Sequence, residues 1–386
     1  MAEATRLEEE GSHIIKMNIG NPAPFGFDAP EEIVRDVIAN FRDAQGYCDS
    51  QGLYSARKAV MQDCQRLGIE GVDIGDIWIG NGVSELISIS LQALMDDGDE
   101  LLIPAPDYPL WTAACSLSGG TPVHYLCDES QDWNPNLEDL ESKITPKTKG
   151  IVVINPNNPT GAVYSRSTLE SIVALARKHS LILFADEIYE KILFDENQHI
   201  PLASLSTDVL TLSFNGLSKA YRAAGFRGGW MVVSGDRRPA ADFLEGLRIL
   251  SNMRLCSNVP AQLAVQTALG GFQSIYTLTA DGGRLLRQRD YIHQRLSAMP
   301  GVDCVKPAGA LYIFPRFNPE VYPIQDDQAF VLSMLRDTHV LAVQGTGFNW
   351  PHPDHMRLVF LPDVDTLTVA MDRIEEFLRK VRINGI

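Results

Sequence analysis

The chain has 386 residues, of which 45% are hydrophobic and 21% charged, which excludes a disordered chain and is long enough for one large and one smaller domain. Its formal net charge of −16 repels nucleic-acid phosphates and anionic lipids, so we expect neither nucleic acid nor a membrane as a partner. The cysteines are scattered without a C-x-x-C pair, and the first residues lack the basic and apolar pattern of an export signal. These features predict a cytoplasmic protein.

The first part of the chain predicts helices separated by ordered loops. An acidic helix over 1–11 and an extended stretch over 13–18 lead to the loop IGNPAPFGF, where glycine and proline prevent regular structure. Asp28 is expected to cap the next helix. The apolar face of that helix would consist of Ile33, Val34, Val37, Ile38 and Phe41. A further helix is expected over 55–67.

From residue 77 onward, short apolar segments alternate with helical ones. Strands are expected at 77–79, 100–103, 123–126, 151–154, 181–185, 210–214 and 230–233. This alternation is typical of an α/β fold with a mostly parallel central sheet covered by helices on both faces. Ligands bind at the carboxyl ends of such strands, where Asn155–Asn158, Asp186 and Lys219 collect.

Beyond about residue 283 the pattern changes to a smaller α+β arrangement. Helices are expected over 284–299, over 327–338 and at the carboxyl end, with strands at 310–315, 340–343 and 356–361. We therefore predict a large domain over 45–282, a small domain made of 12–44 and 283–386, and an N-terminal arm over 1–11.

One segment, TLSFNGLSKAYRAAGFRGGWMVV at 211–233, has the features of a cofactor site. It places Lys219 in a loop between two apolar strands, with Arg227 and several glycines close behind. Small residues let a backbone approach an anion, an arginine fork matches phosphate oxygens, and a lysine forms an imine with an aldehyde. The cofactor that offers both an aldehyde and a phosphate is pyridoxal phosphate.

Further motifs follow in a fixed order along the chain: NIGNP (18–22), YCDSQG (47–52), GNGVSE (80–85), PDYP (106–109), NPNNPTG (155–161), DEIY (186–189), NGLSKAYRAAGFRGG (215–229) and MRLV (356–359). Together they resemble the class I aminotransferases that depend on pyridoxal phosphate, over nearly the whole chain. The resemblance implies the fold-type I transferase architecture, with a large cofactor-binding domain and a smaller α+β domain.

The resemblance implies roles around the cofactor ring. Lys219 would hold the cofactor as an imine and then move the proton of the reaction, while Asp186 would pair with the pyridine nitrogen. A carboxylate directly after the apolar run LILFA would otherwise be buried and unpaired. Asn158 and Tyr189 would donate hydrogen bonds to the ring oxygen O3′, and Tyr108 would stack on the ring.

A phosphate site is implied at Val83, Ser84, Ser218, Arg227 and, from the neighbouring subunit, Tyr47. The contribution of Tyr47 implies a homodimer. The chain departs from the family at Gly216, where many relatives have a serine whose hydroxyl contacts the phosphate. That departure puts one phosphate hydrogen bond in doubt, and Ser218 is the residue that would compensate.

For the substrate, the resemblance implies that Arg357 binds the α-carboxylate as a bidentate fork, with Gly20 and Asn158 beside it. Arg254 has two interpretations that the sequence leaves open: it binds the distal carboxylate of glutamate, or it is a structural arginine at an interface. His352, Asp354 and His355 are metal-binding residue types, but prolines alternate with them, so we expect a structured loop and no metal.

The segments at 18–27, 252–262 and 344–351 look most like those of alanine, or glutamate–pyruvate, aminotransferases. The predicted reaction transfers the amino group of L-alanine to 2-oxoglutarate by a ping-pong cycle, giving pyruvate and L-glutamate. The first alternative is an aspartate aminotransferase. Less favoured are a β-lyase with the same cofactor and a cofactor-binding regulator fused to a DNA-binding module, against which the acidic charge argues.

Overall fold

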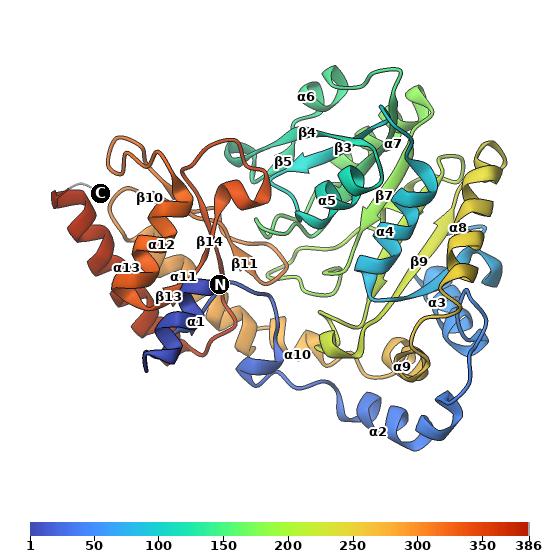
Figure 1. The fold of residues 1–386 in the computed structure, drawn as a ribbon, viewed down its shortest axis with the longest axis horizontal. Helices are drawn as coiled ribbons and strands as arrows, with labels where there is room; N and C mark the ends of the chain where they lie inside the picture. The colour runs from blue at the N-terminus through green and yellow to red at the C-terminus, as the bar shows by residue number, and fades with distance from the viewer. Residues whose placement is uncertain (385–386) are drawn as a thin grey trace.

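The computed structural model describes residues 1–384 and shows two groups of elements side by side (Figure 1). One group is built around an eight-stranded sheet formed by residues 77–234. The other, drawn in orange and red, contains the short strands and helices of the carboxyl-terminal third together with the amino-terminal helix α1 (Ala2–Glu9). The last described helix, α13 (Val364–Asn384), lies in this second group as well. No helix within residues 1–384 combines the length and apolarity that a membrane span requires.

The large sheet has the strand order β2 (Ile77–Asn81), β9 (Gly228–Ser234), β8 (Thr211–Gly216), β7 (Ile182–Asp186), β6 (Thr148–Ile154), β3 (Glu100–Ala105), β4 (Thr121–Asp128), β5 (Asn134–Pro135). The five strands from β8 to β4 run parallel, while β9 is antiparallel to both of its neighbours and β5 to β4. The prediction of a mostly parallel sheet is therefore confirmed. Its seven expected strands are all present, and the short edge strand β5 was not expected.

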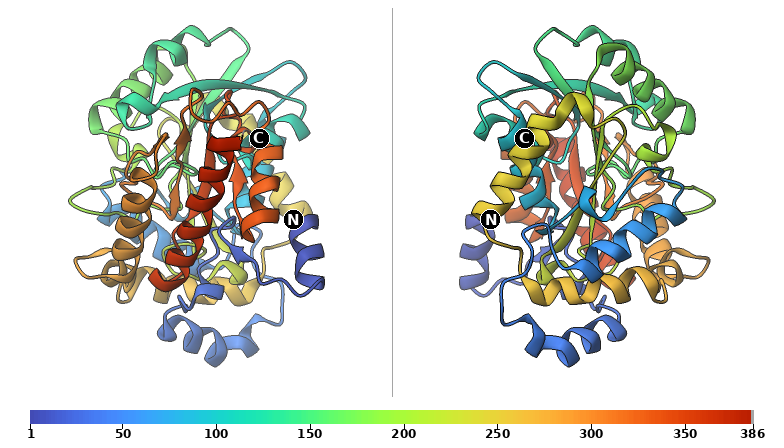
Figure 2. Two further views of the ribbon diagram at one scale, coloured as in Figure 1. Left: turned by 90° about the vertical axis from the view of Figure 1, so that its left-hand side faces the viewer. Right: turned by 90° about the vertical axis from the view of Figure 1, so that its right-hand side faces the viewer.

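Helices cover both faces of this sheet, because its strands carry apolar side chains on both faces (Figure 2). Along β7, Phe184 packs on one face whereas Leu183 and Ala185 pack on the other, because successive side chains of a strand alternate. The first face is covered by α4 (Val83–Leu94), α5 (Leu110–Leu117) and α8 (Ala241–Met253). The second is covered by α3 (Tyr54–Arg66), α6 (Leu137–Ser142), α7 (Arg166–His179) and α9 (Val259–Gly270).

The carboxyl-terminal group consists of short strands covered by α11 (Arg284–Ser297), α12 (Asp327–Thr338) and α13 (Val364–Asn384), with α10 (Ile275–Thr279) leading into it. Its three-stranded sheet has the order β11 (Tyr312–Ile313), β15 (Met356–Val359), β14 (Val343–Gln344). Two strands, β10 (Val302–Asp303) and β12 (Arg316–Phe317), form a separate pair. The strand expected at 340–343 is divided, because β13 (Val340–Leu341) pairs instead with β1 (Ile15–Lys16). This pairing brings the amino-terminal segment into the carboxyl-terminal group.

Helix α2 (Glu31–Asn40) begins later than its sequence suggests. Asp28 does not cap it, because Pro30 is the residue at the cap and no side chain accepts a hydrogen bond from the first turn. The helix lies against α9, where Thr267 Oγ1 donates to Asp36 Oδ2 at 2.5 Å. Of its apolar face, Ile33 is buried whereas Ile38 remains 70% exposed. The two-domain division at 45 and 282 stays a prediction.

Candidate active site

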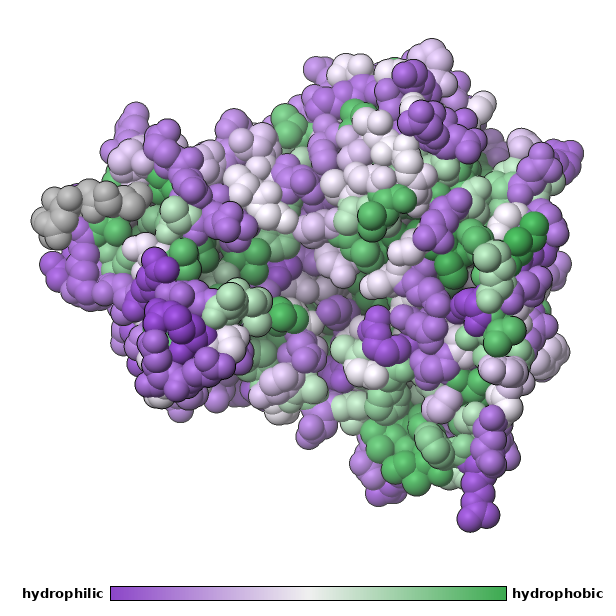
Figure 3. Space-filling model, in the orientation of Figure 1, coloured by the Kyte–Doolittle hydropathy of each residue, from purple (hydrophilic) through white to green (hydrophobic). Residues whose placement is uncertain are grey.

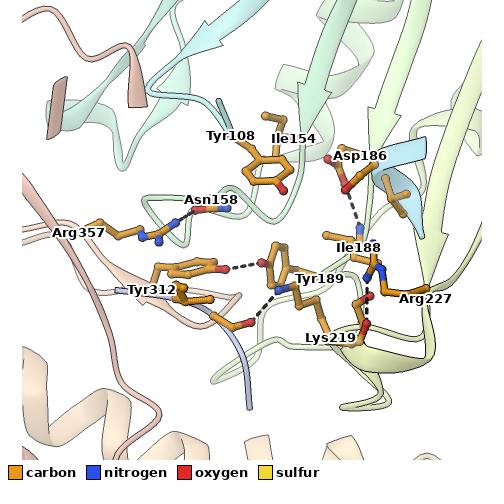
Figure 4. A pocket seen from close by; sticks show the side chains of 16 residues that line it. Tyr108, Ile154, Asn158, Asp186, Ile188, Tyr189, Lys219, Arg227, Tyr312 and Arg357 are labelled. Carbon is orange, nitrogen blue, oxygen red and sulfur yellow. Dashed lines mark hydrogen bonds between the residues drawn. The ribbon is translucent and has the colours of Figure 1, made fainter. Parts of the chain in front are cut away.

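A cavity of about 350 Å³ lies where the carboxyl ends of the parallel strands meet the carboxyl-terminal group (Figure 4). Its walls contain predicted site residues from seven separate parts of the chain, and most of these residues lie at the end of a strand or shortly after it. The predicted residues that line the cavity are Gly20, Val83, Ser84, Tyr108, Asn158, Asp186, Tyr189, Ser218, Lys219, Arg227 and Arg357.

One end of the cavity is a cradle for an anion at the start of α4. Strand β2 turns at Gly82, whose φ is +79°, and no side chain caps the helix that follows, so its first-turn N–H groups are available to a ligand; Val83 and Ser84 of that turn line the cavity. Arg227 lies beside them, with Nη2 donating to the Asn81 carbonyl at 3.3 Å. A Cβ on Gly82 would lie 2.3 Å from Arg227 Nη2. Glycine is therefore what lets this arginine approach the helix end.

The glycine at position 216 also has a structural reason. Gly216 lies opposite Gly229 in the β8–β9 pair, and a Cβ on Gly216 would lie 2.7 Å from the carbonyl oxygen of Gly228. A serine there would require the strand pair to move. Ser218 lines the cavity two residues later, so a hydroxyl is available at this end without a side chain at position 216.

Asp186 is a buried carboxylate at the end of β7 without a charged partner. Its Oδ2 accepts a hydrogen bond from Trp111 Nε1 at 3.1 Å, and its Oδ1 lies 3.5 Å from the backbone N of Ile188. Within residues 1–384 it forms no salt bridge. Burial raises the pKa of Asp186 to about 6, although the Trp111 hydrogen bond opposes this shift. The carboxylate lacks a cation, which a protonated ring nitrogen would provide.

Lys219 reaches from the loop after β8 into the middle of the cavity. Its Nζ donates a hydrogen bond to the carbonyl oxygen of Gly20 at 2.7 Å and lies 5.8 Å from the centre of the Tyr189 ring (Figure 4). Gly20 belongs to the amino-terminal segment that continues from β1. A Cβ on Gly20 would lie 2.1 Å from the hydroxyl oxygen of Tyr312, so only glycine fits between Lys219 and this tyrosine.

The opposite end of the cavity is built around the buried Arg357. Its Nη1 donates to Asn158 Oδ1 at 2.9 Å, its Nη2 donates to the carbonyl oxygen of Asn18, and its buried Nε has no partner among the described residues. The guanidinium carbon lies 4.5 Å from the centre of the Tyr312 ring and 4.4 Å from that of Phe348. Burial lowers the pKa of Arg357. A buried cation with an unpaired donor beside a cavity is suited to binding a carboxylate.

Two site residues were not predicted from the sequence: Tyr312, which lines the cavity, and Trp111, which donates to Asp186. The Tyr312 and Tyr189 hydroxyl oxygens are 2.6 Å apart, and both side chains are buried. Burial, followed by the proximity of Tyr312, raises the pKa of Tyr189 well above its ordinary value. Tyr312 lies in the apolar run ALYIF, where a buried tyrosine is expected to be part of the core, so only its place in the fold reveals it.

Two predicted site residues do not line the cavity. Arg254 forms an ion pair with Glu85 and donates to the carbonyl oxygens of Ser50 at 3.0 Å and Ile79 at 2.9 Å. These contacts use Nη1 and Nη2 outside the cavity, which favours the structural interpretation of Arg254, while its buried Nε has no partner among the described residues. Tyr47 is 82% exposed on the surface of this chain.

The histidine-containing loop at 351–355 is held together by its own contacts. His355 Nδ1 lies 2.7 Å from Asp354 Oδ1, and the imidazole stacks on Phe314 with ring centres 4.7 Å apart. Burial alone would lower the pKa of His355, but the carboxylates of Asp354 and Glu129 outweigh it and raise that pKa. Across residues 1–384, no three His, Cys, Asp or Glu side chains group in a way that could hold a metal ion.

The family model described as "Aminotransferase class I and II" matches residues 12–374 of the chain. The chain belongs to this family. It is 60% identical over 378 residues to the glutamate-pyruvate aminotransferase AlaA of Escherichia coli, with 98% of this chain and 93% of AlaA covered. It is similar to the structure of an alanine aminotransferase from Pyrococcus furiosus, with a TM-score of 0.93, 39% identity, and coverage of 98% and 95%. An aspartate aminotransferase from a Bacillus species is 27% identical over 384 residues, covering 98% and 95%.

The family membership makes the chain an aminotransferase that depends on pyridoxal phosphate. The residues present fit that cofactor, because the cavity contains an anion cradle at one end, a lysine in the middle and a buried carboxylate that forms no ion pair within the described residues. When bound, the cofactor withdraws electrons from the α-carbon of the amino acid and so makes its proton removable.

Proposed function

We propose that the chain transfers the amino group of L-alanine to 2-oxoglutarate, giving pyruvate and L-glutamate. The observation that carries this proposal is the 60% identity to a glutamate-pyruvate aminotransferase over nearly the whole chain, against 27% to an aspartate aminotransferase of similar coverage. The arrangement of the cavity supports it, since the site can bind an α-carboxylate next to the lysine that would move the α-proton.

The proposed roles of the cofactor-binding residues follow from their positions. Arg227, the first-turn N–H groups at Val83 and Ser84, and the hydroxyl of Ser218 would hold the phosphate. Asp186 would accept a hydrogen bond from the ring nitrogen and keep it protonated. Tyr108, Asn158 and Tyr189 would contact the ring and its oxygen. Lys219 would bind the cofactor covalently and, when released by substrate, carry the proton from the substrate α-carbon.

For the substrate, Arg357 would bind the α-carboxylate that alanine and glutamate share. Among the described residues that line the cavity, the cationic side chains are Lys219, Arg227 and Arg357, and only Arg357 lies at the end away from the anion cradle. Arg254 is engaged elsewhere. One anchor common to both substrates suits an enzyme that must accept a small amino acid and a dicarboxylic one at the same site.

A homodimer in which Tyr47 reaches the phosphate site of the partner chain is part of the proposal. Figure 3 shows an apolar patch over α2, and large apolar side chains are exposed there and near the end of α9. These are Ile38, Phe41, Phe272 and Tyr276. A second copy would cover them. Replacing Ile38 and Phe41 together by aspartate is expected to give monomers in sedimentation velocity and weaker cofactor binding; a stable dimer with full cofactor affinity would contradict this proposal. We also propose a cytoplasmic location, in line with six cysteines that form no disulfide.

The proposal is tested by titrating the cofactor-loaded protein with single amino acids and following its absorption spectrum. L-alanine and L-glutamate are each expected to convert the absorption band of the lysine-bound cofactor to that of the aminated cofactor, whereas L-aspartate converts it much less. Conversion by aspartate and glutamate without alanine would identify an aspartate aminotransferase. Release of pyruvate from cysteine-type substrates without any keto acid would identify a β-lyase.

A further inference from the structure

Tyr312 is the polar group of the cavity to which neither the sequence nor the proposed function gives a role. Its hydroxyl oxygen lies 2.6 Å from that of Tyr189, and the two rings meet edge to face with centres 5.6 Å apart (Figure 4). The same hydroxyl lies against Gly20, where an added Cβ would be 2.1 Å away. Tyr312 therefore contacts both the tyrosine expected at the cofactor oxygen and the backbone that binds Lys219.

The Tyr189–Tyr312 hydrogen bond has a direction that follows from counting protons. A tyrosine hydroxyl has one proton to donate and two lone pairs to accept with. If Tyr189 donates its proton to the cofactor oxygen O3′, as proposed above, it cannot also donate to Tyr312. The proton between the two tyrosines must then belong to Tyr312, and Tyr189 accepts it.

We propose that Tyr312 is a positioning residue that acts through Tyr189: it donates a hydrogen bond to the Tyr189 hydroxyl and so makes Tyr189 a stronger donor to the cofactor oxygen. Accepting one hydrogen bond polarises a hydroxyl and strengthens the bond that it donates. This inference rests on the proposed function, because it assigns O3′ as the acceptor for Tyr189.

The ring of Tyr312 has a second role that the experiment must separate from the first. Its centre lies 4.5 Å from the Arg357 guanidinium carbon, which also lies 4.4 Å from the centre of the Phe348 ring. Tyr312→Phe keeps this ring and removes only the hydroxyl, whereas Tyr312→Leu removes both. The charged and titratable groups that face Tyr189 are Tyr312, Tyr108, Arg357 and Lys219. The phenylalanine variant leaves all of these except the Tyr312 hydroxyl unchanged.

The measured quantity is the pH midpoint at which the visible absorption of the lysine-bound cofactor changes. A donor at O3′ weakens the hold of the cofactor on the proton that this oxygen shares with the lysine nitrogen, so losing the donor raises the midpoint. Tyr189→Phe is expected to raise it most. Tyr312→Phe is expected to raise it by a smaller amount, about half a pH unit, because a single neutral hydrogen bond is weakened rather than removed.

The double variant decides whether Tyr312 acts through Tyr189. With Tyr189 already replaced by phenylalanine, a further Tyr312→Phe change is expected to leave the midpoint where Tyr189→Phe put it. In the Tyr312→Phe variant kcat is expected to fall several-fold, while KM for alanine stays close to that of the original chain. Tyr312→Leu should raise KM in addition. Tyr322→Phe, which removes a buried hydroxyl that donates to Pro300 at 2.8 Å outside the cavity, is the matched control and should leave the midpoint unchanged.

Two results would overturn the inference while leaving the proposed function intact: an unchanged midpoint in Tyr312→Phe, or a double variant whose shift equals the sum of the two single shifts. Other results would overturn the inference together with the proposed role of Tyr189 at the cofactor. If the original chain shows no cofactor absorption, or Tyr189→Phe does not move the midpoint, then Tyr189 is not the donor to the cofactor and Tyr312 has nothing to act through.

Discussion

The two ends of the active site are built in different ways. The cofactor end is made by strands of one sheet, where Asp186 ends β7, Gly82 and Lys219 follow β2 and β8, and the backbone ladder fixes their spacing. The substrate end is joined by side chains and carbonyl groups from distant parts of the chain. Arg357 there binds the carbonyl of Asn18 and the side chain of Asn158.

This difference predicts which property a substitution at each end of the site should change. Strand pairing holds the cofactor end in place before any ligand arrives, so changes at that end should affect the cofactor and the chemistry. The substrate end depends on a few polar contacts between separate segments. Changes there should alter amino-acid binding and leave the cofactor in place.

The largest expected effect is that of Lys219→Ala. Without the lysine amine, no group at the centre of the cavity can carry the α-proton, so we expect turnover of alanine and glutamate to fall below detection while the protein stays folded. Stopped-flow assays and circular dichroism would measure both. The cofactor end is expected to keep non-covalent affinity for the cofactor through its anion cradle. Substantial residual transamination would contradict the assignment of Lys219.

Asp186 should give the cofactor-free protein a distinctive pH dependence. Burial raises its pKa from 3.8 to about 6 in the folded chain, so the folded state favours the protonated carboxyl. That stabilisation is fully present below about pH 4 and is lost as the pH rises through about 6. From pH 4 to pH 7, the free energy of unfolding of the original chain should therefore fall by about 2 kcal/mol relative to that of Asp186→Asn.

Urea unfolding of the two cofactor-free proteins at several pH values would measure this difference. Parallel pH profiles would show that the carboxyl group keeps an ordinary pKa. Bound cofactor should abolish the difference in slope, since a cationic ring nitrogen stabilises the charged carboxylate.

At the substrate end, Arg357→Lys should lower kcat/KM for alanine and for glutamate by the same factor, about 30-fold. Lysine keeps the charge but loses the planar fork and the close contacts of the guanidinium with the Tyr312 and Phe348 rings. The dissociation constant of the cofactor, measured by fluorescence, should stay unchanged. A loss confined to glutamate would mean that Arg357 binds the distal carboxylate instead.

The smallest expected effect concerns Arg254→Gln. Because this arginine is engaged by Glu85 and two carbonyl groups outside the cavity, the ratio of kcat/KM for glutamate to that for alanine should stay within about twofold of the original. Some loss of stability is expected, since Glu85 is left without its partner. A ratio that falls tenfold would restore the substrate-binding interpretation.

Much of the cofactor end could be predicted from the sequence because its signals are local. A carboxylate at the end of a buried strand, or a lysine and an arginine among glycines, indicates a ligand site whatever position the strand takes in the sheet. The start of α2 was wrong for a local reason too, because Pro30 moves the helix start beyond the reach of Asp28. The division of the strand at 340–343 was missed because β13 finds its partner at the other end of the chain.

The substrate end was less accessible to sequence reasoning. Tyr312 lies in an apolar run and has no polar neighbour in sequence, yet its hydroxyl meets Tyr189 across the cavity. Arg254 is the reverse case, because an arginine suggested a substrate ligand, whereas its Nη1 and Nη2 contact Glu85 and two backbone carbonyl groups outside the cavity. In both cases the deciding information is which distant segment supplies the partner, and neither periodicity nor composition contains it.

The parallel pairing of Ile15 with Val340 has a consequence for how the enzyme matures on the ribosome. Gly20, whose carbonyl binds Lys219, follows directly from this strand. Because the two paired strands are more than 300 residues apart in the chain, the amino-terminal segment has to wait for β13 to be synthesised before it finds its place. A nascent chain has all strands of the large sheet once Ser234 is made, but the Gly20 carbonyl reaches Lys219 only after β1 has paired with β13.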